Sequence, residues 1–271
     1  MTLANPFKQA VLILACIVAM LPSVFMVLTA LKSQEDYTFD KVGLPDVFVG
    51  THFRAVLFES PFFLWMLNSA ILAVGAVLLG TVVSCCAAYA IARMQFRGRD
   101  TIFAISTALM AVPPVVLIVP LFVLYSQLGL ISSFSGAIVI YAGLITPFSV
   151  YLLTTFFRTL PQELFDAALI DGVKHHQILR HVVLPLAVPA FVTLLVVNAL
   201  FVWNDLLIAV MFLQEDGKRT LMAGISVFQG RYNNQIPLSM AGMVVASAPM
   251  VILYISFQRY FIRGLMAGAI K

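Results

Sequence analysis

Six apolar stretches, each about as long as a membrane-spanning helix, restrict most strongly how this chain folds. Their approximate bounds are 10–31, 65–92, 101–125, 134–157, 184–213 and 237–257. A helix needs about 20 apolar residues to cross the hydrocarbon core of a bilayer. Lipid offers the backbone no hydrogen bonds, so only helices or closed barrels span it, and these stretches lack the alternation of barrel strands. We therefore predict an all-α membrane protein with six transmembrane helices.

The composition excludes a soluble domain. Apolar residues make up 62% of the chain and charged residues 10%, with a mean hydropathy of +1.02. Soluble domains contain about 45–50% apolar and about 25% charged residues. The first stretch is too long for a signal peptide and lacks a small-residue cleavage site, so we interpret it as an uncleaved span. Without repeats or linkers, residues 1–271 are expected to form a single transmembrane domain.

The distribution of lysine and arginine predicts the orientation. With the N-terminus inside, ten basic residues fall in inner segments and six in outer ones. Basic residues are enriched in cytoplasmic loops, so we expect both termini to be cytoplasmic. The net charge of +4 is spread over short loops, which argues against a nucleic-acid partner.

The cysteines and histidines do not predict a metal site. Cys16, Cys85 and Cys86 all lie in apolar stretches, where small buried residues are common and disulfides are not expected. Three histidines cluster between the fourth and fifth stretches, but no acid and cysteine set completes a site. They are His175, His176 and His181.

The segment at about 158–184 predicts two short helices separated by a glycine. Pro161 suits a first helical turn, and Glu163 lies near the positive end of that helix. Gly172 is the expected left-handed stop, and a second helix begins near Lys174. The acids of the first helix would be repelled by anionic lipid, so we interpret it as a docking element for a protein rather than a helix lying on the membrane.

This segment resembles a known family. The pattern Asp166-Ala167-Ala168-x-x-Asp171-Gly172, followed by Leu184-Pro185-Leu186 and Pro189, is similar to the EAA motif of inner-membrane permease subunits of ABC importers. Further patches resemble the carbohydrate, maltose-permease-like branch. They are Leu160-Pro-Gln-Glu-Leu164, Met110-Ala-Val-Pro-Pro114, Trp203-Asn-Asp-Leu206 and the tail from Phe257 to Lys271. In the first acidic position this chain has Asp166, where the family usually has glutamate.

The resemblance implies a type I importer permease for a sugar or oligosaccharide in the bacterial inner (plasma) membrane. It implies four partners besides lipid: a second homologous permease subunit, a cytoplasmic ATPase dimer, a periplasmic or extracellular substrate-binding protein, and the sugar. The EAA loop would couple to the ATPase through Glu163, Asp166, Ala167, Ala168, Asp171 and Gly172. The chain lacks a G-x-x-x-x-G-K-[ST] motif. We therefore expect no enzyme and no cofactor here, with ATP and magnesium bound by the ATPase.

Polar residues and prolines within the apolar stretches are candidates for the translocation path. They are Asn68, Pro113, Pro114, Asn198, Trp203, Asn204 and Asp205. Charge at membrane depth is costly and faces a bundle interior or water. Asp205 therefore either contacts substrate or a gate, or forms hydrogen bonds between helices. The prolines kink the third stretch, which either lines a cavity or serves packing.

The outer loop at about 214–236 has a short apolar centre that re-enters the membrane or lies flat on it. By similarity to the family it reaches the binding protein through Ile225, Ser226, Phe228 and Gln229, or it is a capped surface loop.

Two other classes remain as alternatives. An ion-coupled secondary transporter would need several intramembrane acids or histidines that form a relay. Asp205 alone is weak support for such a relay. An intramembrane enzyme would need a His, Asp or Glu constellation at membrane depth, which the sequence lacks.

Overall fold

The computed structural model describes residues 6–229 and 235–269, with side chains over 7–228 and 235–258, and its regular structure there is helical. By internal contacts the chain divides into two compact units. The first combines Met1–Leu64 with Ala223–Ala248, and the second combines Trp65–Met222 with Pro249–Lys271. The single permease domain inferred from the sequence stays a prediction.

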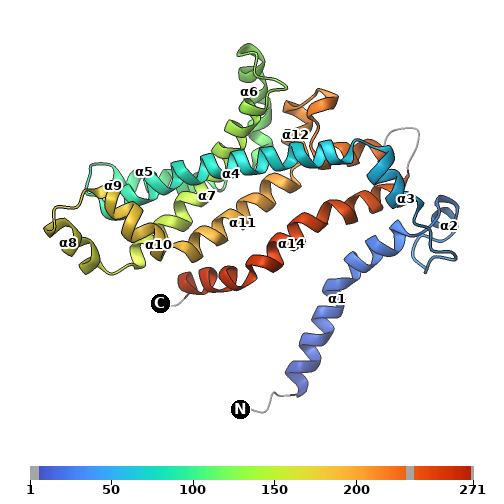
Figure 1. Cartoon of the computed structure of the whole chain (residues 1–271), viewed down its shortest axis with the longest axis horizontal. Helices are drawn as coiled ribbons and strands as arrows, with labels where there is room; N and C mark the ends of the chain where they lie inside the picture. Colours follow the sequence, from blue (N-terminus) through green and yellow to red (C-terminus); the bar gives the residue numbers. More distant parts are fainter. Residues whose placement is uncertain (1–5, 230–234, 270–271) are drawn as a thin grey trace. The chain divides into compact units, whose positions relative to one another are not determined.

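The predicted spans correspond closely to the helices (Figure 1). Four helices are long and apolar enough to cross a membrane, and two bent pairs raise the number to up to six within the described residues. The long helices are α1 (Pro6–Ala30), α4 (Phe62–Arg93), α7 (Phe134–Thr159) and α14 (Ile236–Ala269). The prediction of six membrane spans and of an all-α fold class is therefore confirmed.

The third span is a broken pair rather than a kinked helix. Helix α5 (Arg99–Leu109) and helix α6 (Pro114–Gln127) meet at 99°. Pro113 has extended backbone at ψ 131° and precedes Pro114, the first residue of α6. Proline suits a first helical turn but disfavours helix in the residue before it, so consecutive prolines end one helix and start the next.

The predicted fifth span contains two breaks. The segment His175–Leu186 meets α11 (Val188–Asn204) at 80°, with the bend at Ala187. A second break at Asp205 and Leu206 separates α11 from α12 (Leu207–Phe212). Apolar composition identifies membrane depth but does not reveal such breaks.

The first unit contains an ordered loop after α1, formed by α2 (Gln34–Phe39), α3 (Thr51–Arg54) and the π-helical turn η1 (Ala55–Glu59). Lys32 is 1% exposed, and its Nζ donates to the carbonyl oxygen of Asp40 at 2.6 Å. The Asp40 carboxylate accepts from the backbone N–H groups of Gly43 and Val42, which lowers its pKa. These contacts satisfy the buried ammonium group.

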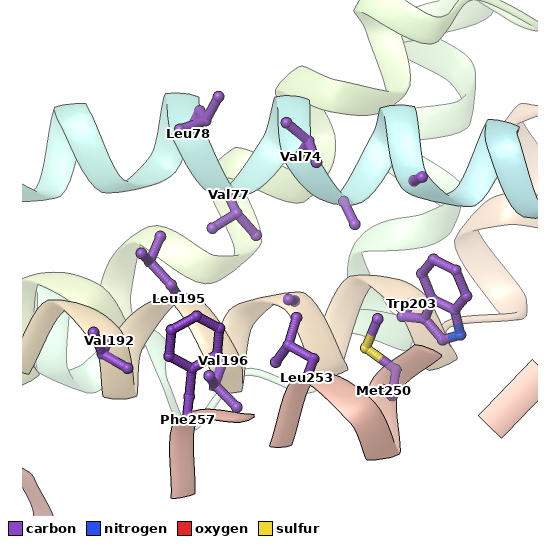
Figure 2. A pocket seen from close by; sticks show the side chains of 13 residues that line it. Val74, Val77, Leu78, Val192, Leu195, Val196, Trp203, Met250, Leu253 and Phe257 are labelled. Atoms are coloured by element: carbon purple, nitrogen blue, oxygen red, sulfur yellow. The ribbon is translucent and has the colours of Figure 1, made fainter. Parts of the chain in front are cut away.

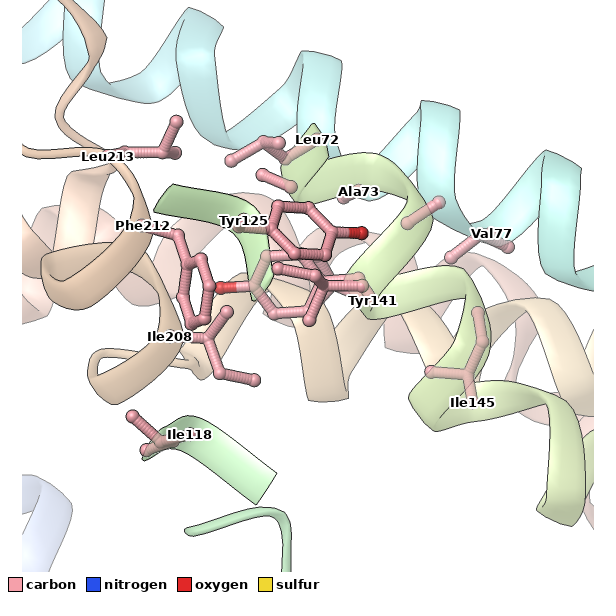
Figure 3. Close-up of a cluster of buried hydrophobic side chains, with 14 residues drawn as sticks. Leu72, Ala73, Val77, Ile118, Tyr125, Tyr141, Ile145, Ile208, Phe212 and Leu213 are labelled. Atoms are coloured by element: carbon pink, nitrogen blue, oxygen red, sulfur yellow. The ribbon is translucent and has the colours of Figure 1, made fainter. Parts of the chain in front are cut away.

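The second unit has two buried apolar clusters along helices α4, α7 and α11, which run side by side (Figure 1). The first cluster joins them to α6 and α12, where the rings of Tyr125 and Phe212 meet edge to face at 5.7 Å between centroids (Figure 3). The second cluster lies toward the other ends of these helices. It includes residues of α8 (Gln162–Ile170), α9 (His175–Ile178) and the π-helical turn η2 (Leu179–Val183).

Close contact between α4 and α7 depends on a small residue. A Cβ atom on Gly80 would lie 2.8 Å from Cδ1 and 2.9 Å from Cγ1 of Ile145, and 3.4 Å from the carbonyl oxygen of Ala142. Small residues let helices approach closely in a membrane, where packing rather than hydrophobicity drives association. Gly80 therefore sets the distance between these two helices.

We predict that Gly80→Val lowers the stability of the purified protein by about 1–3 kcal/mol through overpacking. Gly143→Val is the matched control, because a Cβ there meets no atom within 4 Å. Both changes place valine within a helix, so they share its propensity cost. Thermal unfolding in detergent measures the difference, and equal midpoints for the two variants would contradict the packing role of Gly80.

Candidate functional site

Helix α8 is formed by local signals that the sequence displays. Pro161 is its N-cap residue, and Glu163 lies in its first turn. At the other end, the Gly172 N–H donates to Leu169 and the Val173 N–H donates to Ala168, both at 3.0 Å. This pair of bonds is a Schellman motif. Gly172 has φ +75°, so the left-handed stop predicted there is confirmed.

The surface of α8 is almost entirely free. Phe165 is its one buried residue, at 3% exposed, and it packs into the second cluster. Ala168 is half-buried against the same cluster. The remaining predicted coupling residues are exposed: Glu163, Asp166, Ala167, Asp171 and Gly172. The helix therefore attaches by one face and presents its acids outward.

The outward face also carries apolar side chains that the sequence analysis overlooked. Ile170 is 85% exposed and Leu164 is 42% exposed. Their signal was present, since apolar residues lie beside the acids along this segment. Asp166 accepts a hydrogen bond from Gln162 Nε2 at 3.0 Å, which orients its carboxylate along the helix. A mixed apolar and acidic surface of this kind suits a protein cleft with basic groups at its rim.

The second candidate site is a cavity of about 710 Å³ in the second unit. It lies among the broken pair α5 and α6, helix α7 and helix α11. Two predicted path residues, Pro114 and Asn198, line it. Most other lining groups are apolar or aromatic, including Tyr125, Phe148 and Phe201. The broken span thus borders a cavity, as one of the two interpretations of its prolines expected.

Asn198 is 2% exposed, and its Nδ2 donates to Ser149 Oγ on α7 at 2.9 Å. Ser149 Oγ in turn donates to the Ile145 carbonyl oxygen at 2.6 Å. This chain joins α11 to α7 behind the cavity wall. Asn198 consequently has a structural partner in addition to its place in the lining.

Asp205 closes the break between α11 and α12. Its Oδ1 accepts from the Ile208 N–H at 2.9 Å, the Ala209 N–H at 3.3 Å and the Tyr141 hydroxyl at 2.8 Å. The carboxylate therefore caps α12 and bonds to α7, which is the helix–helix interpretation of this residue. Tyr141 is fully buried in the first cluster (Figure 3).

The other predicted path residues lie away from the large cavity. Asn68 is 3% exposed, and its Nδ2 donates to the carbonyl oxygens of Gly217 at 3.0 Å and Arg219 at 2.9 Å, so it holds the loop after α12. Trp203 lines a smaller apolar cavity of about 380 Å³ among α4, α11 and α14 (Figure 2). Asn204 is exposed at the end of α11, and Pro113 precedes the lining residue Pro114.

The loop predicted to meet a binding protein forms α13 (Leu221–Ser226) and the 3-10 turn η4 (Val227–Gln229). Ile225 is 1% exposed and lies against Gly242, so its side chain does not face outward. Ser226 is half-buried and donates to the Ala223 carbonyl oxygen. The Gln229 side chain and residues 230–234 lie outside the described side chains. The binding-protein contact stays a prediction, with Val227, 50% exposed, as its most accessible described residue.

Comparison with known proteins identifies the class. The chain is 34% identical over 256 residues to a putative ABC transporter permease protein (ORF2) of Caldicellulosiruptor sp., covering 94% of this chain and 93% of that protein. It is 32% identical over 271 residues to the melibiose/raffinose/stachyose import permease protein MelC of Bacillus subtilis, covering 97% and 96%. Its fold matches a chain of a bacterial ABC transporter involved in alginate import. That match has a TM-score of 0.78 and 23% identity, covering 94% and 95%.

The fold defines a multi-pass helical membrane protein with broken spans around a cavity. The family profile described as "binding-protein-dependent transport system inner membrane component" matches residues 77–266, and this chain belongs to that family. The resemblance noted in the sequence is therefore confirmed, and the ion-coupled alternative is wrong.

We predict that Asp205 acts as a cap rather than as a charge. Asp205→Asn keeps an acceptor for the two N–H groups and Tyr141, so stability and uptake should stay near wild type. Asp205→Ala leaves a buried hydroxyl and a helix end unpaired and should cost about 1–3 kcal/mol. Thermal unfolding in detergent and uptake in cells measure the two effects. A stable Asp205→Asn protein without uptake would mean that the charge itself is needed.

Proposed function

We propose that this chain is the sugar- or oligosaccharide-conducting permease of an ATP-driven importer, and that it forms the translocation path with a second, homologous permease subunit. The cavity lined by α6, α7 and α11 is the observation that carries the proposal. Ligand sites are typically apolar and aromatic with few polar groups, and rings such as Tyr125 and Phe148 suit the C–H faces of a sugar. One relative is named a melibiose/raffinose/stachyose import permease, and this name supports the same substrate class.

We further propose that α8 docks in a separate cytoplasmic ATPase dimer, which binds ATP and magnesium, and that this chain itself carries no cofactor. The exposed acids and the exposed Ile170 of α8 support this role. A substrate-binding protein docks on the outer loop, near Val227. Both termini are cytoplasmic in the bacterial inner (plasma) membrane.

The substrate proposal is tested by uptake into cells that express the complete importer. Melibiose, raffinose and stachyose should be taken up in an ATP-dependent manner, and methionine should not. Uptake of methionine without any of the sugars would refute the substrate class.

The coupling proposal predicts that Gly172→Val and Asp166→Lys abolish uptake while the protein still inserts in the membrane. Valine at φ +75° strains the helix stop by about 1–2 kcal/mol, although the space around it is open. Loss of a carboxylate that pairs with a basic group in a partly buried interface costs about 2–5 kcal/mol. Copurification of the ATPase and sugar-stimulated ATP hydrolysis measure the defect.

Asp166→Glu is the matched control, since it keeps the charge and has the residue usual in the family. It should retain uptake. Normal uptake by both Gly172→Val and Asp166→Lys at normal expression would refute coupling through α8.

The orientation is tested by single cysteines in a protein whose native cysteines are replaced. Gln95→Cys and Gln177→Cys should be protected from an impermeant thiol reagent added outside whole cells, whereas Val227→Cys should react. All three parent side chains are exposed, so burial does not account for a difference. Labelling of the first two positions from outside would reverse the proposed topology.

A further inference from the structure

The last residue of α4, Arg93, contacts both α7 and α8. Its guanidinium donates to the carbonyl oxygens of Phe157 and of Leu160, the latter at 2.6 Å. It donates to Gln162 Oε1 at 2.8 Å, and its Cζ lies 3.9 Å from the ring centroid of Phe165. One side chain thus has four partners in a segment more than sixty residues away in sequence.

The four partners have defined places in the fold. Phe157 lies in the last turn of α7, and Leu160 is the C-cap residue of that helix. Gln162 is the first residue of α8, and Phe165 is the one residue of α8 that is buried. Terminal carbonyl groups of a helix lack intrahelical partners and attract cations. Arg93 therefore binds the end of α7, the start of α8 and the buried anchor of α8 at once.

A second contact from α4 lies on the other side of α8. Tyr89, four residues before Arg93, forms a hydrogen bond between its hydroxyl and His175 Nδ1 at 3.1 Å. The two rings also meet edge to face at 6.0 Å between centroids. His175 begins α9, just after the turn at Gly172. The end of α4 thus holds the chain both before and after the exposed surface of α8.

In the chain, helix α8 directly follows α7 and leads through α9 and η2 to α11. Helix α4 is not a neighbour of α8 in sequence. Helix α4 nevertheless lines the first cluster with α6, α7 and α12 and so contributes to the structure around the cavity. A displacement of α8 reaches α7 and α11 through the chain itself. It reaches α4 through side chains, and among these the contacts of Arg93 are the directional ones that reach α8 itself, whereas Tyr89 bonds to His175 after it.

We propose that Arg93 is the positioning residue that transmits displacement of α8 to α4, so that α4 responds to the ATPase together with α7 and α11. The proposal rests on the coupling role proposed for α8. Arginine suits this task because its planar fork serves several acceptors while its face stacks on an aromatic ring. Lysine offers a point charge on a flexible stem and would serve fewer of these partners.

The test uses the importer assembled with its partner permease and ATPase and a fluorophore on α4, at Leu78→Cys in a background without native cysteines. Leu78 is 58% exposed and lines the smaller cavity, so the probe reports on the surroundings of α4 (Figure 2). ATP, magnesium and vanadate trap the closed ATPase and do not require a known sugar. The emission of the probe should shift in the wild-type complex and by less than a fifth as much in Arg93→Gln, with the ATPase still bound.

Arg97→Gln is the matched control, because Arg97 is exposed and lies four residues after Arg93, in the turn before α5, and it should give the full shift. Arg93→Lys should give an intermediate shift, which separates a graded loss of contacts from misfolding. Phe165→Leu removes the ring under the guanidinium and should reduce the shift as well. Phe165→Leu combined with Arg93→Gln should reduce the shift little further than Arg93→Gln alone, because both changes break the same contact between Arg93 and Phe165.

Several outcomes would overturn the proposal. They are a full shift in Arg93→Gln, no shift in the wild-type complex, additive effects of Arg93→Gln and Phe165→Leu, or loss of ATPase binding in Arg93→Lys. The last result would mean that Arg93 shapes the docking surface rather than transmitting its movement. If Gly172→Val and Asp166→Lys transport normally, coupling through α8 fails. If they abolish uptake and Arg93→Gln behaves as wild type, only the role of Arg93 fails.

Discussion

Hydrogen bonds from side chains to the backbone at helix ends are the interaction on which this structure depends. A bilayer leaves broken helices with N–H and C=O groups that water cannot satisfy. Asp205 accepts from two N–H groups at the start of α12, and Asn68 donates to two carbonyl groups in the loop that follows it. Arg93 donates to two carbonyl groups at the end of α7. The break at Asp205 is thereby capped by an adjacent side chain, whereas the loop after α12 and the end of α7 are stabilised by side chains distant in sequence.

This pattern explains why the spans, α8 and the bend at the prolines of the third span could be predicted from sequence, whereas the breaks of the fifth span could not. Span positions follow from apolar length, and the α8 stop follows from Gly172 and its immediate neighbours, because both signals are local. The second break, at Asp205, depends on Tyr141, and the contacts of Arg93 depend on residues of α7 and α8. In the sequence, Arg93 is only one of the ten basic residues that predict the orientation, because its partners become apparent only when the helices are packed.

The same hydrogen bonds show that some of the candidate path residues make contacts within the protein, whereas others line the cavity. Asn68 and Asp205 looked like substrate contacts because polar groups at membrane depth are costly, yet Asn68 Nδ2 and Asp205 Oδ1 already bond to backbone groups of the protein. Asn198 and Pro114 line the cavity, and Asn198 already donates to Ser149. The free-energy cost of a polar group at membrane depth therefore identifies residues that need a hydrogen-bonding partner. It does not reveal whether that partner is a ligand or the protein itself.

A cavity lined mainly by apolar and aromatic groups, in which Asn198 already donates to Ser149, has a consequence for transport. Strong binding of a sugar needs buried hydrogen-bonding groups that are left unpaired without it, whereas rings and aliphatic side chains bind its C–H faces weakly. Passage favours weak binding, because a tightly held sugar would not leave for the cytoplasm when the helices reopen. Selectivity then has to come from a protein that captures the sugar beforehand, which agrees with a family defined by dependence on a binding protein.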